Sequence, residues 1–127
     1  MATWQDVQDV VDRLPETERG TSYGNRAWKV RKKTLAWERP LRKADLDALG
    51  PDAPLGDILG LRTADLEEKD ELLAALPGVF TIPHFEGHTA VLARLETLPV
   101  DVLEHLVRAE YLRKAPKTLA ARVSGAD

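Results

Sequence analysis

The sequence of 127 residues contains no cysteine. Disulfide bonds, thiol nucleophiles and thiolate metal sites are therefore all excluded. A long uninterrupted apolar run is also missing, and the first ten residues, MATWQDVQDV, carry acidic side chains. This beginning is typical of neither a signal peptide nor a membrane span. We expect a cytoplasmic protein with no membrane partner.

Motifs that would indicate an enzyme are absent or match by letter only. The glycines form neither a G-x-G-x-x-G nor a Walker arrangement, so nucleotide hydrolysis is not indicated. Gly20–Gly24, GTSYG, matches the G-x-S-x-G nucleophile elbow, but an elbow needs a buried strand before Ser22 and a helix after it. Here charged residues precede the serine and strand-like residues follow it. We interpret the motif as a turn and predict no catalytic residues.

A pair of histidines is the one arrangement that could bind a metal. His84 and His88 are four residues apart with Glu86 between them. On a helix this spacing would place two imidazoles on one face, but Pro83 and Gly87 argue against a helix here. We interpret both histidines as loop or polar-network residues and predict no metal and no cofactor. A role in ligand contact is the alternative.

The charges are unevenly distributed along the chain. The net charge of −3 and the pI near 5.6 have the wrong sign for a surface that attracts nucleic acid everywhere. Between Arg26 and Lys43, however, eight basic residues accompany a single acid, a net charge of +7. From Asp45 to Glu86 ten acids outnumber two basic residues, a net charge of −8. The folded molecule should therefore be polarised.

Length and composition indicate one globular domain with one core, since 43% of the residues are hydrophobic and 31% charged. Within it, two segments have the composition of β-hairpins. In Val79–Leu95 two apolar runs flank a polar loop, and the alternation places Val91 and Leu92 on opposite faces, both of which should be covered. Ala27–Trp37 alternates as well, and it should form a second hairpin with a charged tip that turns at Lys33–Thr34.

Apolar residues at helical spacing predict the remaining elements. A helix should begin at Thr3, which can form a capping box with Asp6, and end at Pro15. Further helices are expected at residues 41–49, 65–76 and 99–115, a final turn or two at 117–123, a strand at 58–62 and a loop at 16–25. In the two middle helices the leucines, Leu46 and Leu66 included, should face inward.

Three segments of the chain resemble the MmcQ/YjbR family of small bacterial proteins: Gly20–Trp37, Val79–Leu95 and Tyr111–Leu119. The most specific piece is PHFEGHTAVLARL at Pro83–Leu95, and a Pro-Lys pair follows at 116–117. The resemblance implies a double-wing α+β fold, a single domain in which two antiparallel hairpins are packed against N-terminal, middle and C-terminal helices. Residues 39–57 depart from the family pattern and are interpreted as an insertion, and residues 124–127 as a frayed C-terminus.

The resemblance also implies DNA binding. A basic hairpin tip could contact the phosphates of duplex DNA, and binding should then be weak and sensitive to salt. A solvated surface is the ordinary explanation of such a charge run and remains open. The candidate residues are Arg26, Lys29, Arg31, Lys32, Lys33, Arg113, Lys114 and Lys117.

The alternative function is the binding of a small ligand or a protein partner in a cleft between the sheet and the C-terminal helix. Its candidate residues are Trp28, His84, Phe85, Arg94 and Tyr111. Lys29 and Arg94 lie in strand-like segments where an unpaired charge is costly, so each needs a partner. An internal ion pair, exposure of the charged end to water, and an anion-binding cleft are the three interpretations.

Overall fold

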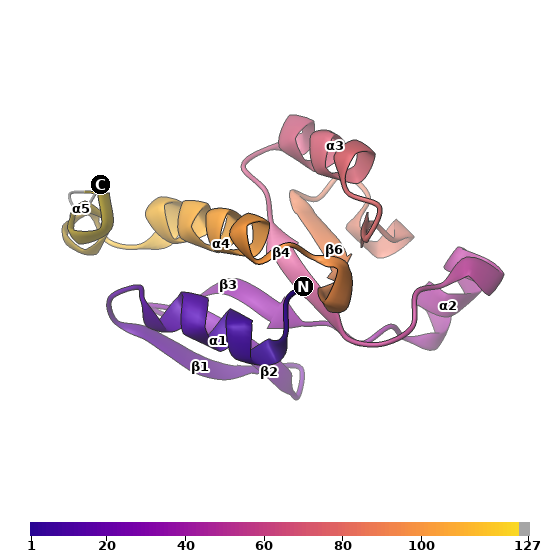
Figure 1. Ribbon diagram of the computed structural model, residues 1–127, viewed down its shortest axis with the longest axis horizontal. Coiled ribbons are helices and arrows are strands. Elements are labelled where there is room, and N and C mark those ends of the chain that lie inside the picture. Colours follow the sequence, from indigo (N-terminus) through magenta and orange to yellow (C-terminus); the bar gives the residue numbers. More distant parts are fainter. Residues whose placement is uncertain (125–127) are drawn as a thin grey trace.

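The computed structural model describes residues 1–124, in which six strands form one antiparallel sheet in the order β1-β2-β3-β4-β6-β5 (Figure 1). The strands are β1 (Thr17–Ser22), β2 (Asn25–Val30), β3 (Lys33–Glu38), β4 (Ile58–Arg62), β5 (Val79–Phe80) and β6 (Ala90–Arg94). The helices are α1 (Trp4–Asp12), α2 (Lys43–Leu49), α3 (Leu66–Ala75), α4 (Val100–Lys114) and α5 (Lys117–Ser124). Short 3-10 helices are η1 (Gly50–Asp52), η2 (Pro83–Phe85) and η3 (Leu95–Thr97). The single α+β domain is as predicted, whereas the frayed end falls largely outside the described residues.

The Val79–Leu95 segment pairs as a hairpin, with Val79 opposite Ala93 and Phe80 opposite Leu92. Its first strand, β5, has only two residues and lies at the edge of the sheet. The second strand, β6, is paired on both sides, since β4 lies on its other side over five residue pairs. Most of the strand pairing of this segment is therefore made by β6.

Strand β1 occupies most of the segment that was predicted as a loop. Six residue pairs join it to β2, and the turn between them is Tyr23-Gly24, with φ of 51° and 81°. Positive φ at both positions is the signature of a tight hairpin turn. The loop prediction was wrong because β1 is an edge strand whose side chains are polar and largely exposed, so it lacks the apolar alternation that marks a strand. Ser22 is thus the last residue of β1 and is followed by a turn and a second strand, which is not the setting of a nucleophile elbow.

The second hairpin, β2 with β3, is present, but it turns at Arg31-Lys32 and not at Lys33–Thr34. Both turn residues have positive φ, 48° and 68°, although neither is glycine. A shift of register between Trp28 and Lys29 inserts an extra residue into the pairing. The prediction placed the turn two residues late because neither the turn nor the bulge carries a glycine or proline signal.

The larger part of the core lies on the face of the sheet that α1 and α4 cover (Figure 1). Trp28 of β2 stacks on Trp4 of α1 with ring centroids 5.9 Å apart, and its indole Nε1–H donates to Gln8 Oε1 at 2.9 Å. The Thr3–Asp6 capping box that begins α1 is present as predicted. Val91 belongs to this core, as do the other apolar strand residues of this face, Leu35, Leu59, Leu61 and Ala93.

A second, smaller apolar cluster covers the opposite face of the sheet. Leu92 and Ile58 belong to it, and η2 contributes Phe85. Trp37, Leu41 and Leu49 pack against its border. Both faces of β6 are therefore covered, as the alternation of Val91 and Leu92 predicted.

Each of the two middle helices buries a charged residue beside leucines that are partly buried, Leu49 in α2 and Leu72 and Leu73 in α3. Leu46 and Leu66 are 43% and 48% exposed, so the prediction that they face inward was wrong. In place of Leu46, α2 buries Asp45, which forms an ion pair with Arg39 at 3.0 Å. In place of Leu66, α3 buries Lys69. Both charges have partners in the fold, and residue type alone did not reveal that they would be buried.

Gly60 of β4 allows the ring of Trp37 to lie directly across the strand. A Cβ at position 60 would be 2.2 Å from Trp37 Cε2, so Gly60→Ala must displace the ring. We expect a loss of about 1–3 kcal/mol in the free energy of unfolding, measured by urea titration, because overpacking strains the neighbours.

Gly20→Ala in β1 is the matched control. Its Cβ would lie 3.7 Å from the Lys29 side chain, an ordinary contact, so the free energy of unfolding should fall by less than about 0.5 kcal/mol. Equal effects of the two substitutions would contradict the assigned role of Gly60.

Candidate functional site

Two neighbouring hollows share residues of β3 and β4: one lies beside the smaller apolar cluster, and the other extends to the end of α4. The first, which we call the arginine–aromatic pocket, has a volume of about 340 Å³ and is lined chiefly by Tyr23, Trp37, Arg42, Arg62, His84 and Phe85. The second, which we call the basic groove, has a volume of about 500 Å³ and is lined chiefly by Lys33, Arg62, Thr63, Glu110, Arg113 and Lys114. Thr34 and Arg62 line both hollows, so the two adjoin at these residues.

Strand pairing between β3 and β4 builds one wall of the arginine–aromatic pocket. Trp37 is the pairing partner of Gly60, and Arg62 follows two residues later on the same face of β4. The Arg62 guanidinium carbon lies 5.0 Å from the centre of the Trp37 ring, and Phe85 meets the same ring edge-on at 6.3 Å. The indole is thereby held between a glycine backbone, a cation and a second aromatic ring.

Two further arginines lie over aromatic rings of this pocket. Arg42 lies 6.0 Å from the centre of the Tyr23 ring, and Arg39 lies 5.8 Å from that of Phe85. Arg39 is neutralised by Asp45, whereas neither Arg42 nor Arg62 has a carboxylate within ion-pair distance anywhere in residues 1–124. Two guanidinium groups without a carboxylate partner in residues 1–124 therefore line the pocket.

Glu38 is the one acid among the lining residues, and its charge is already engaged. Arg26 donates to it through Nη2 at 3.1 Å and through Nε at 3.4 Å. These hydrogen bonds hold the pKa of the Glu38 carboxyl below its usual value. The pocket thus carries net positive charge even though a carboxylate lines it.

The two histidines stand at the rim of the pocket on a loop that Lys69 fixes from beneath. The buried Lys69 Nζ donates to the backbone oxygens of Phe85 at 2.7 Å and His88 at 2.8 Å. The His84 and His88 rings are 6.4 Å apart, centre to centre, and both are exposed. Within the described part of the chain, no three His, Asp or Glu side chains are grouped as metal ligands.

The basic groove joins the start of β3 to the end of α4. Lys33 and Lys114 are exposed and have no ion pair within residues 1–124, while Arg113 is bound to Glu110 at 2.7 Å. Glu110 is only 2% exposed, and its second oxygen, Oε2, accepts no hydrogen bond from the described residues. Two free lysines and a fixed guanidinium therefore border one groove.

The residues proposed for DNA contact are only partly brought together. Lys33, Arg113 and Lys114 line the groove, and Lys32 and Lys117 are exposed outside it. The other three are engaged elsewhere: Arg26 with Glu38, Lys29 with the Thr21 backbone oxygen at 3.1 Å, and Arg31 with Glu16 at 2.9 Å.

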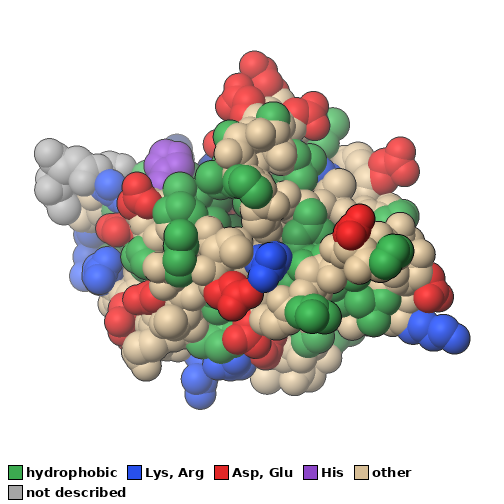
Figure 2. Space-filling model, turned by 45° about the vertical axis from the view of Figure 1, so that its right-hand side comes forward, with side chains coloured by type: hydrophobic (Ala, Val, Ile, Leu, Met, Phe, Trp, Pro, Cys, Tyr) green, Lys and Arg blue, Asp and Glu red, His purple; other side chains and the backbone are tan. Residues whose placement is uncertain are grey.

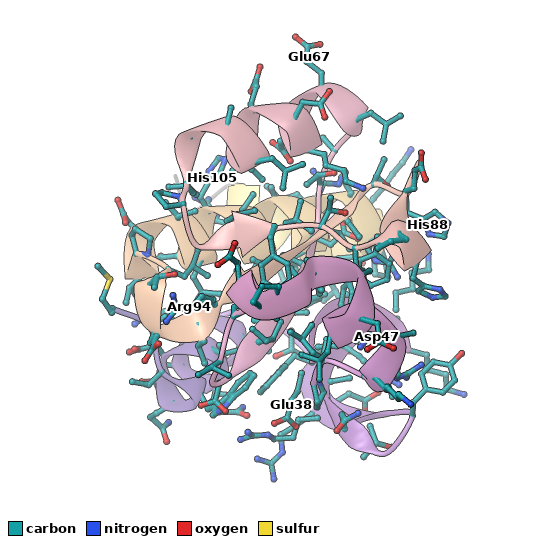
Figure 3. All side chains as sticks on the ribbon, turned by 90° about the vertical axis from the view of Figure 1, so that its right-hand side faces the viewer. Glu38, Asp47, Glu67, His88, Arg94 and His105 are labelled. Carbon is teal, nitrogen blue, oxygen red and sulfur yellow. The ribbon has the colours of Figure 1, made fainter. Side chains whose placement is uncertain are left out.

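The residues proposed for a ligand cleft do not form one. His84 and Phe85 line the arginine–aromatic pocket, but Trp28 and Tyr111 are buried in the core on the other face of the sheet. Arg94 pairs with Glu96 at 2.6 Å, and because both side chains are substantially exposed, this is a surface ion pair and not the internal pair that was considered. Figure 3 shows Arg94 and His88 on opposite sides of the molecule.

The sequence did not single out Tyr23, Trp37, Arg42 or Arg62 as site residues. Arg62 did carry one signal, because it is the only charged residue of a strand in which every other side chain is buried. The strand order that brings it to Trp37 is not visible in the local pattern.

The ion pair of Glu38 should make stability depend on acid pH. Its folded-state pKa lies below the ordinary 4.5, so its contribution is fully present above about pH 4.5 and is lost as the pH falls through the folded-state pKa. We expect Glu38→Gln to flatten the decrease of the free energy of unfolding between pH 5 and pH 3, as followed by urea titration. Glu67→Gln, at an exposed residue of α3 with no ion pair in residues 1–124, is the control and should keep that decrease. A Glu38→Gln profile that parallels the parent profile would refute the expectation.

Comparison with known proteins gives the family. The YjbR family model matches residues 12–113. Uncharacterized proteins of Mycobacterium tuberculosis and Mycobacterium bovis are each 48% identical over 123 residues, which cover 94% of this chain and 93% of theirs. The crystal structure of Deinococcus radiodurans DR2400, a DUF419 domain protein, superposes with a TM-score of 0.65 at 18% identity and covers 98% of this chain and 89% of that one. The chain belongs to the YjbR family.

Proposed function

We propose that this protein binds nucleic acid by its phosphate backbone and that the basic groove is the contact surface. The observation that carries the proposal is that Lys33 of β3 and Lys114 of α4, far apart in sequence, line one groove without acidic partners in the described chain. Exposed lysines near a fixed arginine are the usual partners of phosphate oxygens. The DNA-binding role that the resemblance to the MmcQ/YjbR family implies points the same way.

Segregation of charge makes such binding compatible with a net charge of −3. The exposed acids of α3, among them Glu67 and Asp70, gather at one end of the molecule, which forms the top of Figure 2. At physiological salt, charges more than about 8 Å apart in solvent are largely screened from each other. The basic groove therefore acts by its local charge, and the acids of α3 reduce affinity without preventing contact.

The expected mode of binding is weak and insensitive to sequence. Lysines at a hairpin and at a helix end make phosphate contacts, which carry no base information. The carboxyl end of α4 bears a partial negative charge that opposes phosphate, and Arg113 and Lys114 in its last turn offset it. Affinity should thus depend chiefly on the number of phosphates contacted and on salt.

The test is the double variant Lys33→Ala/Lys114→Ala, titrated with fluorescently labelled duplex DNA from about 25 to about 200 mM salt. Both side chains are exposed and unpaired in residues 1–124, so folding should be unaffected. The slope of log K against log salt should fall by up to about 2, one unit for each phosphate contact removed. Anisotropy of the labelled duplex gives K at each salt concentration.

The matched control is Arg19→Ala/Lys43→Ala, which removes the same charge at two exposed positions outside both hollows. Its slope should stay within about half a unit of the parent slope. Absence of binding at the lowest salt, or equal slopes for the two double variants, would sink the proposal.

A further inference from the structure

We propose that the arginine–aromatic pocket is a binding site for a single nucleotide, a planar base that carries a phosphate group. Free nucleotides and the unpaired end of a strand share this chemistry. The second source rests on the proposed function, because the strand would have to lie in the basic groove. The first does not.

The anionic part of the ligand is specified by Arg42 and Arg62. Each has a guanidinium face against an aromatic ring, which leaves its N–H edge available, and neither has a carboxylate partner in residues 1–124. A guanidinium held in place by a ring is prepared for two parallel hydrogen bonds to a phosphate. Glu38, the one acid of the lining, is occupied by Arg26 and does not neutralise them.

The planar part of the ligand is specified by the rings around the same hollow. Trp37 and Phe85 form its apolar wall, with Tyr23 and the two histidines at the rim. The faces of the Trp37 ring are covered by the Gly60 backbone and Arg62, so a base would stack on the exposed rings of the rim, Tyr23 and the histidines. Such stacking tolerates any base, because every base has a π-face. A volume of about 340 Å³ is at the small end of ligand pockets, so the site suits one nucleotide and not an oligomer.

A purely structural role explains the pocket less well. An exposed arginine over a ring contributes only about 0.5–1 kcal/mol, and Tyr23, which is 92% exposed, adds nothing to the core. Two arginines from separate elements, one in β4 and one just before α2, repel each other when they serve the same hollow. A bound phosphate removes that repulsion.

The two residues that the hollows share link the nucleotide to a strand. Thr34 and Arg62 line both, so a backbone lying along Lys33 and Lys114 leads directly to the pocket. A terminal unpaired nucleotide could then enter it, whereas a paired base is held in the duplex stack and could not. The protein should therefore prefer a duplex with a single-stranded overhang to a blunt duplex.

The binding of free nucleotide can be read from the indole N–H signals in a ¹H–¹⁵N correlation spectrum. Trp37 lines the pocket, while Trp28 is buried in the main core and Trp4 packs against it on the other face of the sheet, so these two serve as internal references. Trp37→Phe assigns the signal. Adenosine 5′-monophosphate, adenosine and inorganic phosphate are the three probes.

We expect adenosine monophosphate to shift the Trp37 signal in a saturable manner, with the Trp4 and Trp28 signals unchanged. Adenosine and phosphate should each bind at least about tenfold more weakly, since each offers half of the recognised chemistry. Arg42→Gln should weaken nucleotide binding by about tenfold or more. Lys43→Gln, which removes the neighbouring charge outside the pocket, should leave it unchanged.

Three results would overturn the site. They are no saturable shift up to about 10 mM nucleotide, equal binding of phosphate alone, and an Arg42→Gln variant that binds as the parent does. None of them depends on duplex binding. The site and the proposed function can therefore fail separately.

The source of the nucleotide is decided by comparing blunt and overhanging duplexes. We expect the parent protein to bind the overhanging duplex several-fold tighter than the blunt one. Arg42→Gln should abolish that preference without changing the salt slope of the blunt duplex. Lys33→Ala/Lys114→Ala should weaken the binding of both duplexes and leave the binding of adenosine monophosphate intact. Nucleotide binding without any overhang preference would overturn the strand-end source and leave the free nucleotide as the ligand.

Discussion

The close approach of the Trp37 ring to the backbone of Gly60 is the contact on which the second face of the sheet depends. Because residue 60 has no side chain, the indole can cross β4 and meet Phe85 of η2 at 6.3 Å. The same ring supports Arg62, which lines both hollows. The absence of a side chain at residue 60 thus determines how the smaller apolar cluster packs and where Arg62 lies between the two hollows.

Buried charges hold the chain segments around this contact in place. Arg39 and Asp45 join the chain before α2 to α2 itself, and Lys69 holds the loop after η2 through two backbone oxygens. Hydrogen bonds that involve a charged group contribute about 1.5–3 kcal/mol when they are buried and paired. Loss of Asp45 would leave the buried Arg39 without its ion pair, and loss of Lys69 would leave two carbonyl groups without a donor. Polar anchors therefore hold the segment with both histidines together with the apolar packing of Phe85.

Patterns among neighbouring residues predicted much of this fold but few of the residues that line the arginine–aromatic pocket. Both hairpins, the Thr3 cap and β4 could be predicted, because alternation and capping are properties of neighbouring residues. Strand β1 was missed because an exposed edge strand has no apolar alternation, and Leu46 and Leu66 were misplaced because Asp45 and Lys69 took the buried positions. Lys33, Arg113 and Lys114 were named as candidates from their charge together with the family resemblance. Arg42 and Arg62 became visible only with the strand order, which is a non-local property.

The acidic helix α3 sets the direction from which a phosphate backbone can approach. Thr63 and Ala64 line the basic groove, and the Ala64 amide donates to Glu68 of α3 at 2.9 Å, so the groove ends at a carboxylate on this side. At Arg62 and Thr34 it adjoins the arginine–aromatic pocket. A backbone that extended over α3 would meet like charge within a Debye length, whereas one that ends near Arg62 would meet two unpaired guanidinium groups. The charge pattern therefore favours a strand that terminates at the pocket over a duplex that runs across the whole surface.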